Sequence, residues 1–161
     1  MGTGKTSVAK VLAKRLSRKF IEMDEAIEER EKRPITEIFR INGEDYFRRL
    51  EKEIVEDISK ENNLAVSCGG GVILDKDNIK NLKKSGIIIC LWANPDVIYK
   101  RVKGQSHRPL LNVDHPGERI KELLDARKTF YDKSDYKIDT SNLTIQEVAG
   151  EIIKLIENKK Q

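Results

Sequence analysis

The chain has 161 residues, 36% of them charged and 38% hydrophobic, and its net charge is +4. That length is typical of one globular domain whose core needs no metal or disulfide. The charges are mixed along the chain, and no apolar run approaches the roughly 20 residues of a membrane span, so neither nucleic-acid binding nor membrane insertion is expected. Cys68 and Cys90 lie in apolar stretches and are expected to be reduced thiols of a cytoplasmic protein.

The chain opens with MGTGKT, which matches the end of the phosphate-binding loop pattern G-x-x-x-x-G-K-[ST]. Glycines let backbone N–H groups converge on phosphate oxygens, and the helix that follows directs its N-terminal dipole at the anion. Lys5 is expected to reach the β- and γ-phosphates, and the Thr6 hydroxyl to bind Mg²⁺. A simple helix-capping turn is the alternative interpretation. The nucleotide-binding residues predicted here are Gly2, Thr3, Gly4, Lys5, Thr6 and Ser7.

A strand is expected before this loop. In a doubly wound P-loop fold that first strand is central, and neither the strand nor the first glycine of the pattern is present in the chain. We therefore expect the natural chain to start about ten or more residues upstream, since a strand typically has ~5–6 residues.

The first half of the chain alternates helical and strand patterns. Apolar residues at helical spacing follow the loop, and a short apolar step at residues 20–21 predicts an edge strand. Asp24 is a candidate N-cap for a helix at 25–32, which Pro34 would end. Helical spacing returns until Asn42-Gly43, a turn pair, and again at 44–60. Residues 64–68 then predict a buried strand that ends at three consecutive glycines.

The second half continues the alternation. Residues 86–92, GIIICLW, form the continuous apolar run of a strand covered on both faces. The segment 103–116 has no periodicity and is long for a loop in a compact domain, which favours a mobile lid. The other expected elements are helices at 75–85, 95–102, 118–131 and 145–156 and a strand at 136–139. This order predicts an α/β fold with a parallel sheet flanked by helices, and ligands beyond the carboxyl ends of its strands.

The order of the motifs resembles that of the shikimate kinase family over essentially the whole chain. GTGKT is followed by an acidic step, then by FRRLE, GGG, RPLL and a tail strand with a polar turn. The resemblance implies one three-layer P-loop kinase domain at 1–161, with a shikimate-binding helical segment at about 24–60 and a lid at about 103–116. It implies a cytoplasmic, monomeric enzyme that uses MgATP to phosphorylate the 3-hydroxyl of shikimate.

The resemblance also implies roles for residues on the shikimate side. Asp24 would contact the substrate hydroxyls and is a candidate general base. Arg48 and Arg127 would bind the carboxylate, because a planar guanidinium can hold it bidentately. The glycines of the triplet would bring backbone amides against the substrate: Gly69, Gly70 and Gly71. The alternatives are surface arginines on amphipathic helices and a flexible strand-to-helix turn.

On the nucleotide side, the resemblance implies that Arg108 of the RPLL motif stabilises charge in the transition state. Arg101 would stack on adenine, and the turn at 140–142 would border it. His107 and His115 are expected to be exposed, with no metal role. Phe39 and Phe47 are either the apolar wall of the shikimate pocket or ordinary core residues.

One residue departs from the family pattern. Glu22 stands where the family usually has the first aspartate of Asp-x-Asp, which helps to organise Mg²⁺. Glutamate keeps the charge on a longer side chain and would act through a bridging water. Two other functions are left open: another small-molecule P-loop kinase, such as one for gluconate, and a nucleotide- or shikimate-binding module that has lost catalysis.

Overall fold

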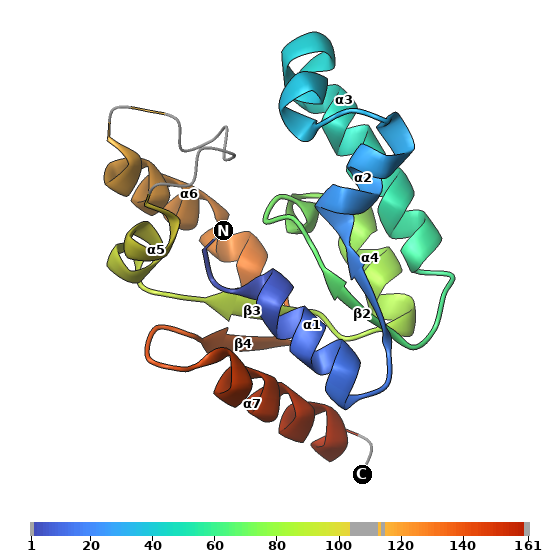
Figure 1. Ribbon diagram of the computed structural model, residues 1–161, viewed down its shortest axis with the longest axis vertical. Helices are drawn as coiled ribbons and strands as arrows, with labels where there is room; N and C mark the ends of the chain where they lie inside the picture. Colours follow the sequence, from blue (N-terminus) through green and yellow to red (C-terminus); the bar gives the residue numbers. More distant parts are fainter. Residues whose placement is uncertain (1, 104–112, 114, 160–161) are drawn as a thin grey trace.

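The computed structural model describes residues 2–103, 113 and 115–159 (Figure 1). Helices and strands alternate along the described chain, so the predicted α/β class is confirmed. In chain order the elements are α1 (Lys5–Arg15), β1 (Lys19–Glu22), α2 (Met23–Glu31), α3 (Ile35–Ile58), β2 (Leu64–Ser67), the 3₁₀ helix η1 (Val72–Leu74), α4 (Lys76–Ser85), β3 (Ile89–Trp92), α5 (Pro95–Val102), α6 (Pro116–Tyr131), β4 (Tyr136–Asp139) and α7 (Ile145–Asn158).

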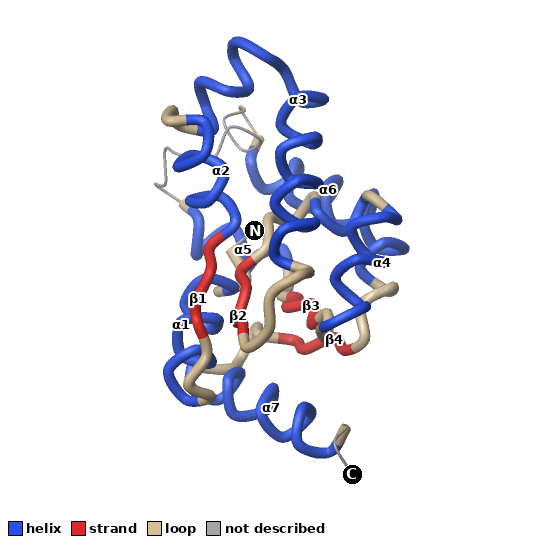
Figure 2. The backbone as a smooth tube through the Cα atoms, turned by 90° about the vertical axis from the view of Figure 1, so that its right-hand side faces the viewer, coloured by secondary structure: helices blue, strands red, loops and turns tan. Residues whose placement is uncertain are grey.

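The strands form two short parallel sheets. β1 pairs with β2 from Lys19↔Leu64 to Glu22↔Ser67, and β3 pairs with β4 from Ile89↔Tyr136 to Trp92↔Asp139. Within the described chain β2 and β3 share no ladder. The sequence analysis predicted parallel pairing, which is confirmed, but it predicted one sheet where the described chain has two. Helices flank both sheets, with α1 and α7 on one side and α4 and α6 on the other (Figure 2).

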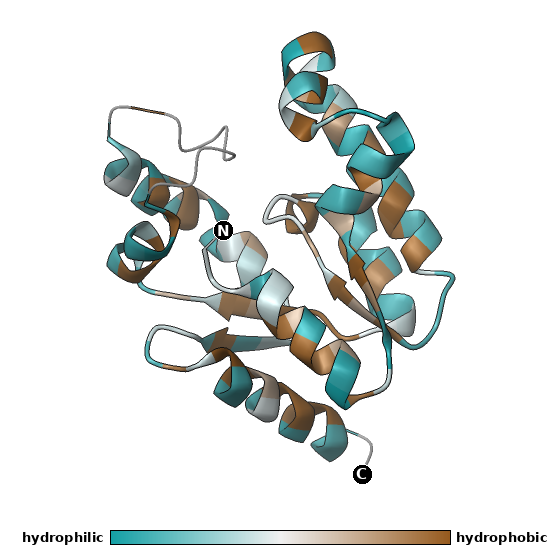
Figure 3. Ribbon diagram, viewed as in Figure 1, coloured by the Kyte–Doolittle hydropathy of each residue, from teal (hydrophilic) through white to brown (hydrophobic). Residues whose placement is uncertain are grey.

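Three buried apolar clusters hold these layers together, and apolar residues concentrate on the strands and the inward faces of the helices (Figure 3). The first cluster joins α2, α3 and η1 and contains Met23, Ile27, Ile38, Phe47, Leu50, Ile54, Val55, Ile58 and Val72. The second contains Ala93, Ile98, Val102, Ile120 and Leu123. The third joins α1, β4 and α7 through Val8, Ile138, Val148 and Ile152. None of the described helices is long and apolar enough to cross a lipid bilayer.

The start of α2 differs from the predicted one. α2 begins directly at the end of β1, with Glu22 at the N-cap position, so the prediction that Asp24 caps this helix was wrong. Asp24 lies in the first turn instead, where a negative charge interacts favourably with the helix dipole. Within the span of α3 the predicted turn pair is confirmed, because Gly43 has the non-helical angles φ 78° and ψ 177° and two helical segments meet there at a kink.

Candidate active site

The start of α1 is open toward an approaching anion. Gly4 precedes the helix with φ 87°, and Gly2 also has a positive φ, of 64°. In the described structure no side chain caps this helix, and its first turn contains no acidic residue. The first N–H groups of the helix, its dipole and the Lys5 ammonium are therefore available to one anion, as a phosphate-binding loop requires.

The loop before α1 is anchored to the carboxyl end of β4. The Thr140 side chain is buried, and its Oγ1 lies 3.3 Å from the carbonyl oxygen of Thr3. Arg101 of α5 donates from Nη1 to Thr140 Oγ1 (3.1 Å) and from Nη2 to the Thr140 carbonyl (2.7 Å). The structure therefore brings Arg101 and the turn at 140–142, both predicted to border adenine, together beside the phosphate-binding loop.

Oxygen ligands gather where β1 and β2 end. Thr6 Oγ1 lies 3.4 Å from Ser67 Oγ, and Ser67 is paired in register with Glu22. Glu22 Oε2 is buried with no hydrogen-bond partner among the described atoms. The described residues contain no group of three or more His, Cys, Asp or Glu side chains that could by themselves hold a metal ion. One carboxylate and two hydroxyls fit Mg²⁺, which keeps several waters and is usually completed by substrate phosphates.

The glycine turn after β2 packs directly against charged side chains. A Cβ atom added to Gly69 would lie 2.9 Å from Glu51 Oε1 and 3.4 Å from Asp24 Oδ1. A Cβ on Gly71 would lie 2.6 Å from Arg48 Cζ and 2.9 Å from its Nη2. A larger side chain at either position would therefore displace these charged groups.

Arg127, which lies on α6, also reaches this glycine turn. A Cβ on Gly70 would lie 3.6 Å from Arg127 Nη1 and 3.3 Å from the Tyr131 hydroxyl oxygen. That hydroxyl also donates a hydrogen bond of 3.2 Å to the Gly70 carbonyl. Because Gly70 and Gly71 are adjacent, the guanidinium groups of Arg48 and Arg127 converge on one turn.

A carboxylate pair holds Arg48 in place. Nε and Nη2 donate to Glu44 Oε1 at 3.2 and 2.7 Å, and Nη1 donates to Glu51. Burial raises the pKa of Glu51, although the Arg48 charge opposes this. Burial lowers the pKa of Arg48, but the neighbouring carboxylates of Glu51 and Glu44 raise it by more, so the net shift of this pKa is upward. With 27% of its side chain exposed, Arg48 is not the surface arginine of the alternative interpretation.

Cys68, at the end of β2, links the two halves of the site. Burial raises the pKa of its thiol to about 12, and the charges of Lys5, Glu22, Glu51 and Asp24 also act on it. Lys5 and the carboxylates beside the glycine turn therefore lie around one strand end. This is the carboxyl edge at which ligands bind in open α/β sheets.

Glu51 and Tyr131 are among the side chains of this site that sequence reasoning missed. Glu51 lies between Phe47 and Ile54 on the buried stripe of α3. A charged residue at a position where the helical pattern expects an apolar one could have indicated its role. Tyr131 follows Arg127 by one helical turn and could have been grouped with it.

The remaining predicted residues have simpler outcomes. Phe39 and Phe47 pack against each other within the first apolar cluster, with ring centroids 4.8 Å apart. His115 is exposed, as expected. Arg108 and His107 lie outside the described residues.

The comparison with known proteins identifies the family. A family model described as shikimate kinase matches residues 1–157. This chain belongs to the shikimate kinase family. It is 49% identical over 154 residues to the shikimate kinase of Thermodesulfovibrio yellowstonii, covering 96% of this chain and 89% of that protein. It is 46% identical to the shikimate kinase of Thermoanaerobacter pseudethanolicus, with 96% and 90% covered.

Solved structures of the shikimate kinase family have the same fold. The shikimate kinase from Acinetobacter baumannii in complex with shikimate matches with a TM-score of 0.94 at 32% identity, covering 99% of this chain and 90% of that one. The shikimate kinase from Aquifex aeolicus matches with a TM-score of 0.86 at 32% identity, covering 99% and 94%. These matches extend the family assignment from sequence to three-dimensional fold.

Proposed function

We propose that this member of the shikimate kinase family transfers the γ-phosphoryl group of ATP to the 3-hydroxyl of shikimate, giving ADP and shikimate 3-phosphate. The observation that carries the proposal is the convergence of Arg48 and Arg127 on the glycine turn, which lines the same pocket as Lys5. Two guanidinium groups suit a substrate that carries one carboxylate.

The acid-binding end of the site is built around Arg48. A guanidinium has five N–H donors, and Glu44 and Glu51 engage three of those of Arg48. One N–H on each Nη remains, which forms a fork for a carboxylate. Arg127 would hold the same carboxylate from α6. The three glycines allow the substrate to approach the backbone, and Asp24, beside Gly69, would accept the proton of the reacting hydroxyl.

The phosphate-binding end uses residues 2–7. The backbone amides of the loop would hold the phosphates, and Lys5 would neutralise the β- and γ-phosphates. Thr6 and Glu22 would hold Mg²⁺, Glu22 through water. The ion would supply charge neutralisation across the phosphate oxygens. Since phosphoryl transfer depends on positioning and electrostatics, these residues act mainly by fixing the nucleotide in line with the hydroxyl.

The proposal includes the segments that border the nucleotide. Arg101, held by Thr140, would lie against adenine with the turn at 140–142. Arg108, within a lid at about 103–116, would stabilise the charge of the transferred group. The enzyme would be a single domain over 1–161 that acts as a monomer in the cytoplasm.

A coupled ADP-release assay with shikimate, with gluconate and with no acceptor tests this function. ADP should form only with shikimate. Release with gluconate would assign a different kinase, and no release with either acid would assign a binding module.

Within the same assay, Arg48→Ala should raise the KM for shikimate far more than the KM for ATP. The matched control is Arg49→Ala, because Arg49 is exposed and lies over the Tyr46 ring. Equal effects of the two variants, or equal effects on both substrates, would contradict the role of Arg48.

A further inference from the structure

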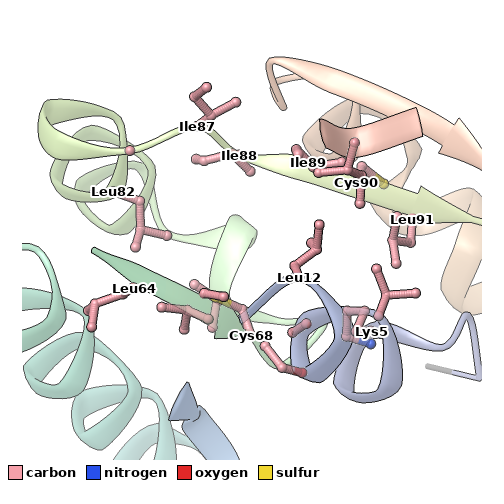
Figure 4. A pocket seen from close by; sticks show the side chains of 18 of the residues that line it. Lys5, Leu12, Leu64, Cys68, Leu82, Ile87, Ile88, Ile89, Cys90 and Leu91 are labelled. Atoms are coloured by element: carbon pink, nitrogen blue, oxygen red, sulfur yellow. The ribbon is translucent and has the colours of Figure 1, made fainter. Parts of the chain in front are cut away.

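A hydrogen bond joins α6 to the glycine turn. The hydroxyl of Tyr131, the last residue of α6, donates to the Gly70 carbonyl at 3.2 Å. In the described part of the chain no other hydrogen bond links this helix to residues 69–71. Gly69, Gly70 and Tyr131 line the same pocket as Lys5 and Cys68 (Figure 4). The proposed reaction leaves this hydroxyl without a role.

The two arginines that converge on the glycine turn are held in different ways. Arg48 is fixed by ion pairs with Glu44 and Glu51. Among the described residues Arg127 has no hydrogen bond or ion pair, although its charge acts on Glu51. The position of its guanidinium therefore depends on the position of α6. Tyr131 lies one helical turn after Arg127, so a bond that fixes Tyr131 also fixes the backbone that carries Arg127.

The glycine turn is anchored independently of α6. The buried Asn78 side chain donates from Nδ2 to the Val72 carbonyl at 3.2 Å, and the Val72 N–H donates to the Gly69 carbonyl, also at 3.2 Å. These bonds tie the turn to α4. If the Tyr131 bond is lost, α6 should therefore move relative to the turn, while the turn keeps its place.

We propose that Tyr131 is a positioning residue for acid binding: its bond to the Gly70 carbonyl holds α6 against the glycine turn and thereby sets the spacing between the guanidinium groups of Arg127 and Arg48. This role rests on the proposed function, since two guanidinium groups share one carboxylate only at a defined spacing. An added Cβ on Gly70 would lie 3.3 Å from the Tyr131 hydroxyl oxygen and 3.6 Å from Arg127 Nη1, so both side chains pack against this one residue.

Tyr131→Phe removes the hydroxyl and keeps the ring. In isothermal titration calorimetry the Kd for shikimate should rise about 3- to 10-fold, the effect of one lost hydrogen bond. The Kd for MgATP should stay within about twofold of the wild-type value, because Thr140 anchors the phosphate-binding loop without α6. Tyr136→Phe is the matched control and should change neither Kd, since Tyr136 begins β4, at the end remote from the carboxyl edge.

The outcomes separate this role from the proposed function. An unchanged Kd for shikimate in Tyr131→Phe would overturn the positioning role, even if the Tm fell, because the hydroxyl would then contribute to stability alone. A wild-type protein that binds no shikimate would contradict the proposed function and, with it, this role.

A double-mutant cycle tests whether Tyr131 acts through Arg127. Its readout is kcat/KM for shikimate, which stays measurable when binding is weak. Tyr131→Phe should lower it about 3- to 10-fold in the wild type but less than about twofold in Arg127→Ala, where no guanidinium remains for α6 to position. Equal losses in the two backgrounds would overturn the proposal, since the hydroxyl would then act independently of Arg127.

Discussion

Gly71→Ala tests whether the glycine turn positions Arg48 for the acid. Gly71 has φ −91° and ψ −17°, which alanine adopts without strain. Its Cβ would nevertheless lie 2.6 Å from Arg48 Cζ, and ordinary carbon contacts are about 3.5–4.0 Å, so the guanidinium must move by roughly 1 Å. The loss of one charge-assisted hydrogen bond costs about 1.5–3 kcal/mol. At 1.4 kcal/mol per factor of ten, the KM for shikimate should rise about 10- to 100-fold.

Steady-state kinetics with each substrate varied in turn, together with thermal unfolding, measures this effect. The KM for ATP should change less than about threefold, because the displaced Arg48 guanidinium bonds to Glu44 and Glu51 and not to the proposed nucleotide-binding residues. Gly117→Ala is the matched control, since no described atom outside its own helix and chain neighbours lies within 4 Å of its added Cβ. An unchanged KM for shikimate in Gly71→Ala, with the Tm also unchanged, would refute the positioning argument.

Three further variants probe separate parts of the structure. Thr144→Ala removes the capping box that Thr144 and Glu147 form at the start of α7. It should lower the Tm by about 2–4 °C without changing kinetics. Thr140→Val removes the Arg101 hydroxyl partner and should raise the KM for ATP about 3- to 10-fold but leave that for shikimate unchanged. Since burial raises the pKa of Glu51 above 4.5, the folded state binds its proton more tightly. In urea denaturation, wild-type stability relative to Glu51→Gln should therefore increase as the pH falls through that pKa. The prediction would be wrong if the free energies of unfolding of wild type and Glu51→Gln changed with pH by the same amount.

Much of the fold follows from local patterns in the sequence. The strand at 136–139 and the helix at 95–102 were predicted with their observed bounds, because proline, asparagine and apolar spacing act within a few residues. The glycine triplet marked a place of close backbone approach, and the structure fills that space with Glu51, Asp24 and Arg48.

The parts that sequence reasoning missed depend on tertiary contacts. Asp24 has the residue type of an N-cap, but β1 leads straight into α2, so the cap position falls on Glu22. Tyr131 is distant from Gly70 in sequence, and only the packing of α6 against the turn brings its hydroxyl to the Gly70 carbonyl. The split into two sheets is also a tertiary property, since the run 86–92 alone predicts a strand covered on both faces and not which strands pair with it.

The most direct test of the central claim is the identity of the phosphorylated product. In ³¹P NMR of a reaction with MgATP and shikimate, we expect one new phosphomonoester signal, coupled to the proton on carbon 3 of shikimate and equal in amount to the ADP formed. A spectrum in which ADP accumulates with inorganic phosphate alone would contradict the proposal that the arginine pair holds the acid in line with the nucleotide.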